Sequence, residues 1–298
     1  MLPLYTYVLF GYIAGKKLDA HLDTIAKLMF YLITPIIVFN GTLHTPITAN
    51  VLSVPVLTYL FACSMCLLFY QISRRIWSDS SKNIIAFSAG SGATGYFGIP
   101  LAMLLFSPEK EGLYIMSLLG VTLYDYSVGY YISSKGSYSA MSCLYRVVKL
   151  PTLYAFALGL FLNYFSIEMP VVYHDFIGHI RGVYTVLGMM IVGVGIAGVA
   201  HITLDYKFIA VAFIAKFIVW PLLVFSFVWI DISYLHWYGS DIHHALTLIS
   251  IVPIAVNTVM MASMANSHPE KASLTVLLST LFALVYIPLM VNLLLPDL

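Results

Sequence analysis

Long apolar runs separated by short polar segments make up almost the whole chain. A bilayer core is about 30 Å thick and takes about 20 apolar residues as a helix, so runs of this length predict transmembrane helices. Ten such runs occur, at 2–15, 24–43, 52–73, 84–106, 112–132, 148–167, 176–199, 206–230, 244–265 and 272–295. We therefore predict an all-α, polytopic membrane protein in which residues 1–298 form a single transmembrane domain. No basic residue precedes the first run, and Lys16-Lys17 follow it, so we expect a short first span and not a signal peptide.

Basic residues fall in alternate polar joints between these runs. One set of joints contains Lys16-Lys17, Arg74-Arg75 with Lys82, the segment 133–147 with Lys149, Lys207 and Lys271, whereas the other set contains a single basic residue, Lys110. Positively charged short loops stay on the cytoplasmic side of a membrane. The alternation therefore supports ten transmembrane helices in the cytoplasmic (inner) membrane, with both termini outside.

The longest polar joint, at 133–147, divides the chain into two sets of five predicted helices, 1–132 and 148–298. An odd number of helices in each half gives the halves opposite orientations, and inverted repeats of this kind are common in secondary transporters. Their binding sites lie at the midplane, where matching helices are broken by glycine or proline. The fourth helix carries four glycines and a proline between Ser88 and Pro100, and the ninth carries Pro253 and Asn257. We therefore predict crossed, broken helices 4 and 9, although two proline kinks in ordinary packed helices would give a similar pattern.

Composition narrows the possible functions. Hydrophobic residues make up 61% of the chain and charged residues 9%, against roughly 45–50% and 25% in soluble domains, which argues against a water-soluble enzyme. The net charge of +1 provides no field for nucleic acid. The nine histidines fall mostly in loops and at helix ends, so neither a metal nor another cofactor is expected. Cys63 and Cys66 lie in an apolar run and are interpreted as small buried hydrophobes.

The two predicted breaks resemble the crossover motifs of the auxin efflux carrier (AEC) family, which includes bacterial malonate and malate permeases and plant PIN carriers. The resemblance rests on the segment Tyr96-Phe97-Gly98-Ile99-Pro100-Leu101 and on Pro253-x-Ala255-x-Asn257. It implies ten helices in two inverted five-helix repeats, an architecture related to sodium/bile-acid symporters, and transport of organic anions by an elevator-like movement. The first crossover Asn of that family falls on Ala93 here, so another polar side chain would have to replace its amide.

The broken helices also define the expected substrate site. The N-terminal end of a half-helix presents free N–H groups and a positive dipole, which suit a carboxylate that has lost its water. We predict substrate-binding roles for polar or helix-breaking residues at this depth, namely Ser91, Thr94, Gly95, Tyr96, Pro100, Pro253, Asn257, Thr258 and Asn40. An alternative role for Asn257 is to bond a backbone group that Pro253 leaves unpaired.

Two ionisable residues lie deep in predicted spans, Asp125 in the fifth and Lys216 in the eighth. Such residues are costly in a membrane and are functional by default. They could form a structural ion pair, or Asp125 could carry a proton. Arg181 lies near the start of the seventh helix and is expected to extend to the interface.

We therefore expect a secondary active or facilitative transporter of small organic anions or weak acids (carboxylates), working by elevator-like alternating access. The alternative is a non-transporting sensor or receptor that binds a small ligand in the crossover pocket. An enzyme is not expected, because Asp125 has no second mid-span aspartate to form an intramembrane protease site. The expected partners are the organic anion and the lipid bilayer, with no nucleic acid. A homodimer stays open, since Gly188, Gly193 and Gly198 permit close packing within or between chains.

Overall fold

The computed structural model describes residues 2–134, 140–198 and 204–294, and every regular element within them is a helix. Helices are favoured because a chain in hydrocarbon must satisfy its backbone groups internally. The elements in chain order are α1 Leu2–Lys17, α2 Leu22–Leu28, η1 Met29–Ile33, α3 Thr34–Leu43, α4 Ala49–Ile76, α5 Ser81–Gly90, α6 Gly98–Leu105, α7 Pro108–Tyr126, α8 Val128–Ser133, α9 Ala140–Val148, α10 Pro151–Tyr164, α11 Val171–Ala197, α12 Tyr206–Ile214, η2 Ala215–Val219, α13 Trp220–Ile230, η3 Asp231–Leu235, α14 Ser240–Ile251, α15 Asn257–Met264 and α16 Pro269–Leu294. The three η segments are single π-helical turns continuous with their neighbours.

Several helices have the length and hydropathy of membrane spans. Five qualify among the described residues: Leu22–Leu43, Ala49–Ile76, Val171–Ala197, Tyr206–Leu235 and Pro269–Leu294. A sixth is added if Met141–Val148 and Pro151–Tyr164, which are bent by 53° at their junction, count as one span. The chain is thus a multi-pass membrane protein. Helix occurs in each of the ten predicted ranges, but the count of ten crossings and the inverted repeats stay predictions.

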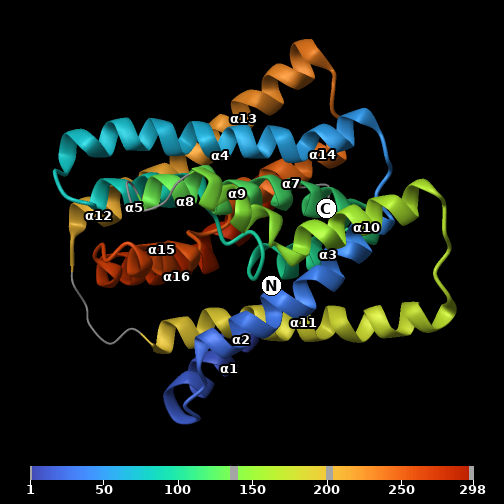
Figure 1. Cartoon of the computed structure of the whole chain (residues 1–298), viewed down its shortest axis with the longest axis horizontal. Coiled ribbons are helices and arrows are strands. Elements are labelled where there is room, and N and C mark those ends of the chain that lie inside the picture. Colours follow the sequence, from blue (N-terminus) through green and yellow to red (C-terminus); the bar gives the residue numbers. More distant parts are fainter. Residues whose placement is uncertain (1, 135–139, 199–203, 295–298) are drawn as a thin grey trace.

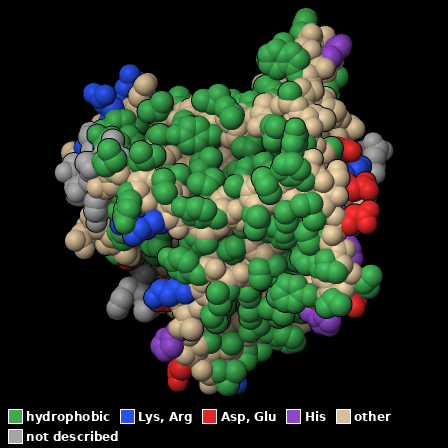
Figure 2. All heavy atoms as spheres, turned by 45° about the vertical axis from the view of Figure 1, so that its right-hand side comes forward, with side chains coloured by type: hydrophobic (Ala, Val, Ile, Leu, Met, Phe, Trp, Pro, Cys, Tyr) green, Lys and Arg blue, Asp and Glu red, His purple; other side chains and the backbone are tan. Residues whose placement is uncertain are grey.

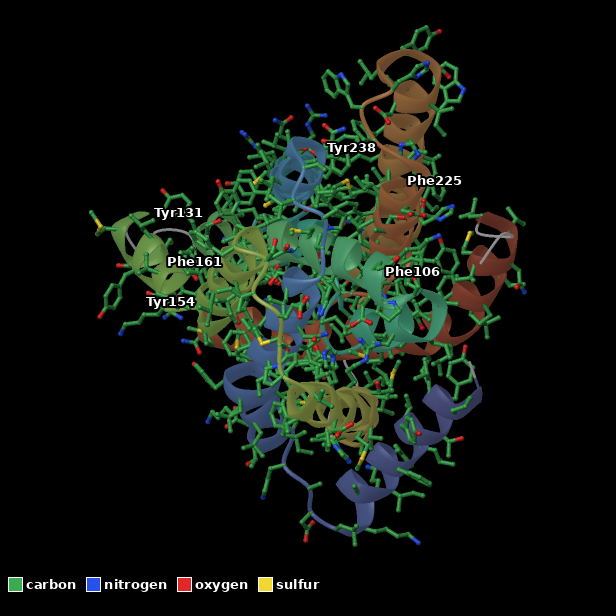
Figure 3. All side chains as sticks on the ribbon, turned by 90° about the vertical axis from the view of Figure 1, so that its right-hand side faces the viewer. Phe106, Tyr131, Tyr154, Phe161, Phe225 and Tyr238 are labelled. Carbon is green, nitrogen blue, oxygen red and sulfur yellow. The ribbon has the colours of Figure 1, made fainter. Side chains whose placement is uncertain are left out.

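The outer surface is largely apolar. Figure 2 shows hydrophobic side chains over most of one face, with most Lys and Arg at its left edge and most Asp and Glu at its right edge. Figure 3 shows Tyr131, Tyr154 and Phe161 on one side of the molecule. These residues are 47%, 59% and 56% exposed, respectively. Apolar exposure on this scale suits contact with lipid, whereas a soluble protein would cover it.

The polar joint predicted at 133–147 is not a loop throughout. Residues 140–148 form helix α9, while residues 135–139 lie outside the described part of the chain. The sequence allows the helix because apolar residues recur among the polar ones, with Met141, Leu144 and Val148 all on its exposed surface. Within the described residues, the second half of the predicted joint is therefore helical.

The helices pack in layers around the two interrupted ones. Figure 1 shows α4 along one side of the molecule and α11 along the other, with α5, α15 and α16 between them. Arg181 connects α11 to α7, because its guanidinium forms a salt bridge of 2.6 Å with Glu111. Glu111 is almost completely buried, with a side chain only 2% exposed. Arg181 itself is 25% exposed, so its predicted extension to the interface stays a prediction, and its partner Glu111 is an addition from the structure.

Close helix contacts explain the small residues of α11. A Cβ added to Gly193 would overlap the carbonyl oxygen of Val8 in α1, and one added to Gly188 would lie 2.8 Å from the carbonyl oxygen of Tyr96. A Cβ added to Gly198 would have only carbonyl oxygens of its own helix nearby, at 3.6 and 3.8 Å. Gly188 and Gly193 thus allow close packing within the chain, and a homodimer stays a prediction.

The contact between α1 and α11 predicts a position-specific loss of stability. We expect Gly193→Ala to destabilise the folded protein by about 1–3 kcal/mol, the usual cost of overpacking, measured by thermal unfolding in detergent. Gly182→Ala in the same helix is the matched control, because a Cβ there meets nothing within 4 Å. Equal stability of the two variants would contradict the observed packing of α1.

Candidate functional site

Two helices are interrupted in the middle of the molecule. The first interruption, residues 91–97, separates α5 from α6, and the second, residues 252–256, separates α14 from α15. The N–H of Ala93 in the first donates a hydrogen bond of 2.9 Å to the carbonyl oxygen of Pro253 in the second. Glycine and proline favour these breaks, because glycine weakens a helix and proline removes a donor. The two non-helical segments therefore lie directly against each other.

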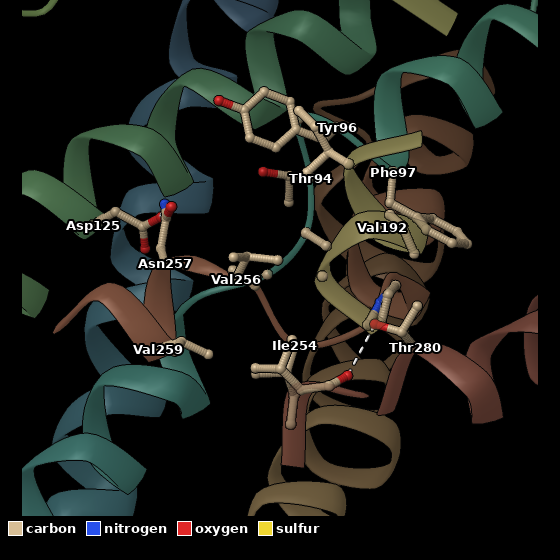
Figure 4. A pocket seen from close by; sticks show the side chains of 18 of the residues that line it. Thr94, Tyr96, Phe97, Asp125, Val192, Ile254, Val256, Asn257, Val259 and Thr280 are labelled. Carbon is tan, nitrogen blue, oxygen red and sulfur yellow. Dashed lines mark hydrogen bonds between the residues drawn. The ribbon is translucent and has the colours of Figure 1, made fainter. Parts of the chain in front are cut away.

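A cavity of about 170 Å³ lies beside this contact. Its wall includes both interruptions and residues from α2, η1, α3, α7, α10, α11 and α16. Most of the wall is apolar, with Phe30, Leu118, Ile191 and Val276 among its residues. Asp125 is the one charged side chain among the described residues that line it. Figure 4 shows the cavity with Thr94, Tyr96, Asp125 and Asn257 around it.

Asp125 and Asn257 form the polar centre of the cavity wall. The side-chain amide of Asn257 donates a hydrogen bond of 3.0 Å to Oδ2 of Asp125, and the two side chains lie next to each other in Figure 4. Oδ1 of Asp125 has no hydrogen-bond partner, although the residue is 4% exposed. The buried hydroxyl of Ser91 lies beside this carboxylate, close enough to interact with it. Oδ1 of Asp125 is thus an acceptor that Ser91, a ligand or a proton can use.

Three further hydroxyl groups lie in the cavity wall, those of Thr34, Thr152 and Tyr184, which come from α3, α10 and α11. Thr34 and Tyr184 are close enough to interact with each other, whereas the Thr152 hydroxyl has no partner among the described residues. A buried polar group without a partner costs about 1–3 kcal/mol. A polar ligand that bonded Thr152 would remove that cost.

Free backbone donors also face this region. The residues before α6 (Gly95, Tyr96 and Phe97) and those at the start of α15 (Ala255, Val256 and Asn257) all line the cavity. No acceptor among the described residues bonds the N–H of Tyr96 or of Val256. Each half-helix N-terminus carries about half a positive charge. The two termini together form a suitable environment for an anionic group.

The structure brings most of the predicted site residues together. Thr94, Gly95, Tyr96, Pro253, Asn257 and Asp125 all line the cavity. Ser91 and Thr258 are buried beside it without lining it, and the Thr258 hydroxyl has no partner.

Two predicted binding residues lie elsewhere. Pro100 is buried in α6, where it faces Gly188 of α11. Asn40 lies in α3 and accepts a hydrogen bond of 3.1 Å from the Tyr173 hydroxyl. Neither residue lines the cavity, so their predicted binding roles are corrected: Pro100 packs two helices together, and the Asn40 amide is used by α11.

Lys216 does not form the predicted ion pair with Asp125. Lys216 lies in the π turn η2 and is 1% exposed. No carboxylate oxygen of a described residue lies within 4.0 Å of its Nζ. Its charge and that of Asp125 are close enough to interact at longer range. Its Nζ lies instead 5.0 Å from the centre of the Trp220 ring and against Gly92. It therefore belongs to the crossing of the helices and not to the cavity wall.

The unpredicted cavity residues include three with buried hydroxyl groups, Thr34, Thr152 and Tyr184. Thr34 and Thr152 adjoin Pro35 and Pro151, but prolines near helix starts are too common to mark a site. Tyr184 is one of 22 tyrosines, and nothing in its local sequence separates it from those that face lipid. A test for polar residues on the inward face of α11 could have found Tyr184.

Comparison with known proteins adds two matches. Residues 182–298 match the model of the Sodium Bile acid symporter family. The whole chain is similar to an uncharacterized transporter of Methanothermobacter thermautotrophicus, with 22% identity over 297 residues that cover 97% of this chain and 95% of that protein. The predicted membership of the auxin efflux carrier family is therefore wrong: the family model that matches is the Sodium Bile acid symporter one, and it includes the second interruption and α16. Together the two matches support a membrane transporter.

Proposed function

We propose that this protein is a secondary transporter of small organic anions or weak acids, and that the cavity between the two interrupted helices is its substrate site. The observation that carries the proposal is the convergence of two half-helix N-termini, with unbonded N–H groups at Tyr96 and Val256, on one buried cavity. A carboxylate there would replace its lost water with backbone donors. The similarity to a transporter family supports the choice of a carrier over an enzyme or a receptor.

The cavity wall also limits the shape of the substrate. Its volume of about 170 Å³ is below the roughly 300–1,000 Å³ of pockets for drug-sized ligands. Its apolar residues, such as Phe30 and Val276, suit a small hydrocarbon body. We therefore infer a compact acid with one apolar end, and not a sugar or a nucleotide.

Asp125 provides a reason for proton coupling. A substrate carboxylate within about 4 Å of an ionised Asp125 would be repelled by about 4 kcal/mol at an effective dielectric constant of 20. A proton on the unpartnered Oδ1 would remove this repulsion and turn that oxygen into a donor. Anion and proton would then bind together, and the substrate would move as a weak acid.

We further propose that the chain crosses the cytoplasmic membrane ten times in two inverted repeats, with both termini outside. The crossings would be α1, α2–α3, α4, α5–α6, α7–α8, α9–α10, α11, α12–α13, α14–α15 and α16. Supporting this, Lys and Arg gather at one edge of the surface and Asp and Glu at the other (Figure 2). Alternating access would come from an elevator-like movement of the crossed segments against the remaining helices.

The substrate site predicts different effects for two asparagines. A thermal-shift screen of small acids, including succinate, phenylacetate and 2-oxoisovalerate, would first identify a stabilising ligand. In proteoliposomes we expect Asn257→Ala to lower uptake of that ligand at least tenfold, because the variant loses the amide beside Asp125. Asn40→Ala is the matched control and should transport normally. Equal uptake by both variants would contradict the site, and binding without flux in the wild type would favour a receptor.

The coupling role predicts a specific defect in Asp125→Asn. An amide can still donate to a carboxylate but cannot exchange a proton, so we expect ligand binding and ligand exchange to persist. Accumulation driven by a pH gradient should fall at least tenfold, as measured by uptake with and without the gradient. An unchanged response to the pH gradient would exclude Asp125 as the proton carrier.

The topology predicts opposite labelling of two exposed positions. In a background with Cys63, Cys66 and Cys143 replaced by serine, we expect Glu168→Cys to react with a membrane-impermeant maleimide in intact cells. Lys207→Cys should react after permeabilisation alone, because basic joints face the cytoplasm. Both positions are exposed in the structure, so burial would not explain a difference. Labelling of both from the same side would contradict the ten-span arrangement.

A further inference from the structure

Lys216 is a buried cation without a carboxylate partner. Two other buried charges are neutralised directly, since Glu111 pairs with Arg181 and Asp231 with His243. Lys216 is 1% exposed, yet it forms no salt bridge or hydrogen bond with the described residues. An isolated ammonium is very costly to bury. Asp125 attracts the ammonium at longer range, and a charged Lys216 also needs a nearer source of negative potential.

The surroundings of Nζ identify that source. A Cβ built on Gly92 would lie 2.5 Å from Nζ and 3.3 Å from the side chain of Val252. Gly92 is the second residue after the end of α5, and Val252 is the first residue after the end of α14. The Trp220 ring lies 5.0 Å from Nζ and adds a cation–π contact. The ammonium therefore lies where the C-terminal ends of two half-helices meet.

These helix ends are electrically negative. The carbonyl oxygens of Ala89 and Gly90 in α5, and those of Ser250 and Ile251 in α14, accept no hydrogen bond from the described residues. A helix C-terminus carries about half a negative charge, so two of them together match one ammonium. Carbonyl oxygens at interrupted helices are also the groups that coordinate a sodium ion or a proton in many transporters.

We propose that the Lys216 ammonium is a built-in cation at the crossing of α5 and α14, in the place of a free monovalent cation. The side chain reaches this position from the π turn η2, which widens the helix at Lys216. A free sodium ion at the same place would be repelled by the ammonium, so the crossover assembles without one. This inference goes beyond the proposed function and holds whether or not the cavity binds an organic acid.

The test measures stability and needs no substrate. Thermal unfolding in detergent is compared in sodium, ethylammonium and choline chlorides at equal ionic strength. The wild type should unfold at the same temperature in all three salts. Lys216→Ala should unfold at a lower temperature in choline and recover several degrees in sodium or ethylammonium, because a small cation can enter the space left by the side chain. Lys216→Met should also unfold at a lower temperature than the wild type, and this temperature should not depend on the cation, since the Met side chain fills that space.

Two controls keep the result decisive. Lys110→Ala, which removes an exposed partner of Asp241, should show no selectivity among the cations. Gly92→Ala places a methyl group against Nζ and should cost more stability than Gly95→Ala, whose added Cβ has its nearest neighbour at 3.8 Å. Selective stabilisation of the wild type by sodium would overturn the proposal, and so would a Lys216→Ala variant that ignores all three cations. If Lys216→Ala does not fold, the comparison of the wild type in the three salts still decides, because selective stabilisation by sodium would overturn the proposal.

Discussion

Two helices that stop halfway through an apolar protein must satisfy the backbone groups at their broken ends. Each such group costs several kcal/mol, roughly, when it is left unpaired in hydrocarbon. The hydrogen bond from Ala93 to Pro253 satisfies one donor and one acceptor, and it fixes the two breaks against each other. The other broken helix ends carry partial charges of opposite sign, positive at the N-terminal ends and negative at the C-terminal ends. The residues that precede α6 and α15 line the cavity, whereas Gly92, just after the end of α5, lies against Lys216; we propose that the carbonyl ends of α5 and α14 favour its charge. The positions of the cavity and of the buried lysine both follow from this division.

The polarity of the broken ends also explains how a carboxylate is tolerated in the cavity wall. Asp125 of α7 lies next to the start of α15, where the amide of Asn257 and the positive helix end both favour a negative charge. Lys216 adds a longer-range attraction from the opposite side of the crossing. Placed among apolar side chains alone, a carboxylate would have none of this support. The start of α15 and the amide of Asn257 therefore stabilise the negative charge of Asp125 together.

The sequence was sufficient to predict the features that depend on local chemistry. Glycine and proline mark the interruptions, and a charged residue within an apolar run marks Asp125 and Lys216 as unusual. The direction in which a side chain points, and the residue far along the chain that it contacts, depend on tertiary packing. The periodicity of the sequence does not specify either. For that reason Pro100 and Asn40 were placed in the site, Tyr184 was missed, and the pairing of Arg181 with Glu111 was not predicted. The family was misassigned for a related reason: Gly98-x-Pro100 and Pro253-x-Ala255-x-Asn257 are residues that a broken crossing helix needs, so they report the architecture more strongly than the ancestry.

A tethered cation has a consequence for energy coupling. A free sodium ion that binds on one side of a membrane and leaves on the other supplies the energy of its gradient, whereas Lys216 stays attached to η2 throughout. On the proposed arrangement its charge stabilises the crossing equally in every state and supplies no driving force, because a fixed charge has no differential binding to contribute. Any coupling ion must then bind elsewhere. Among the described cavity residues, Asp125 is the charged one, so the proposed tethered cation at the crossing and the proposed proton-binding carboxylate are two parts of one electrostatic arrangement.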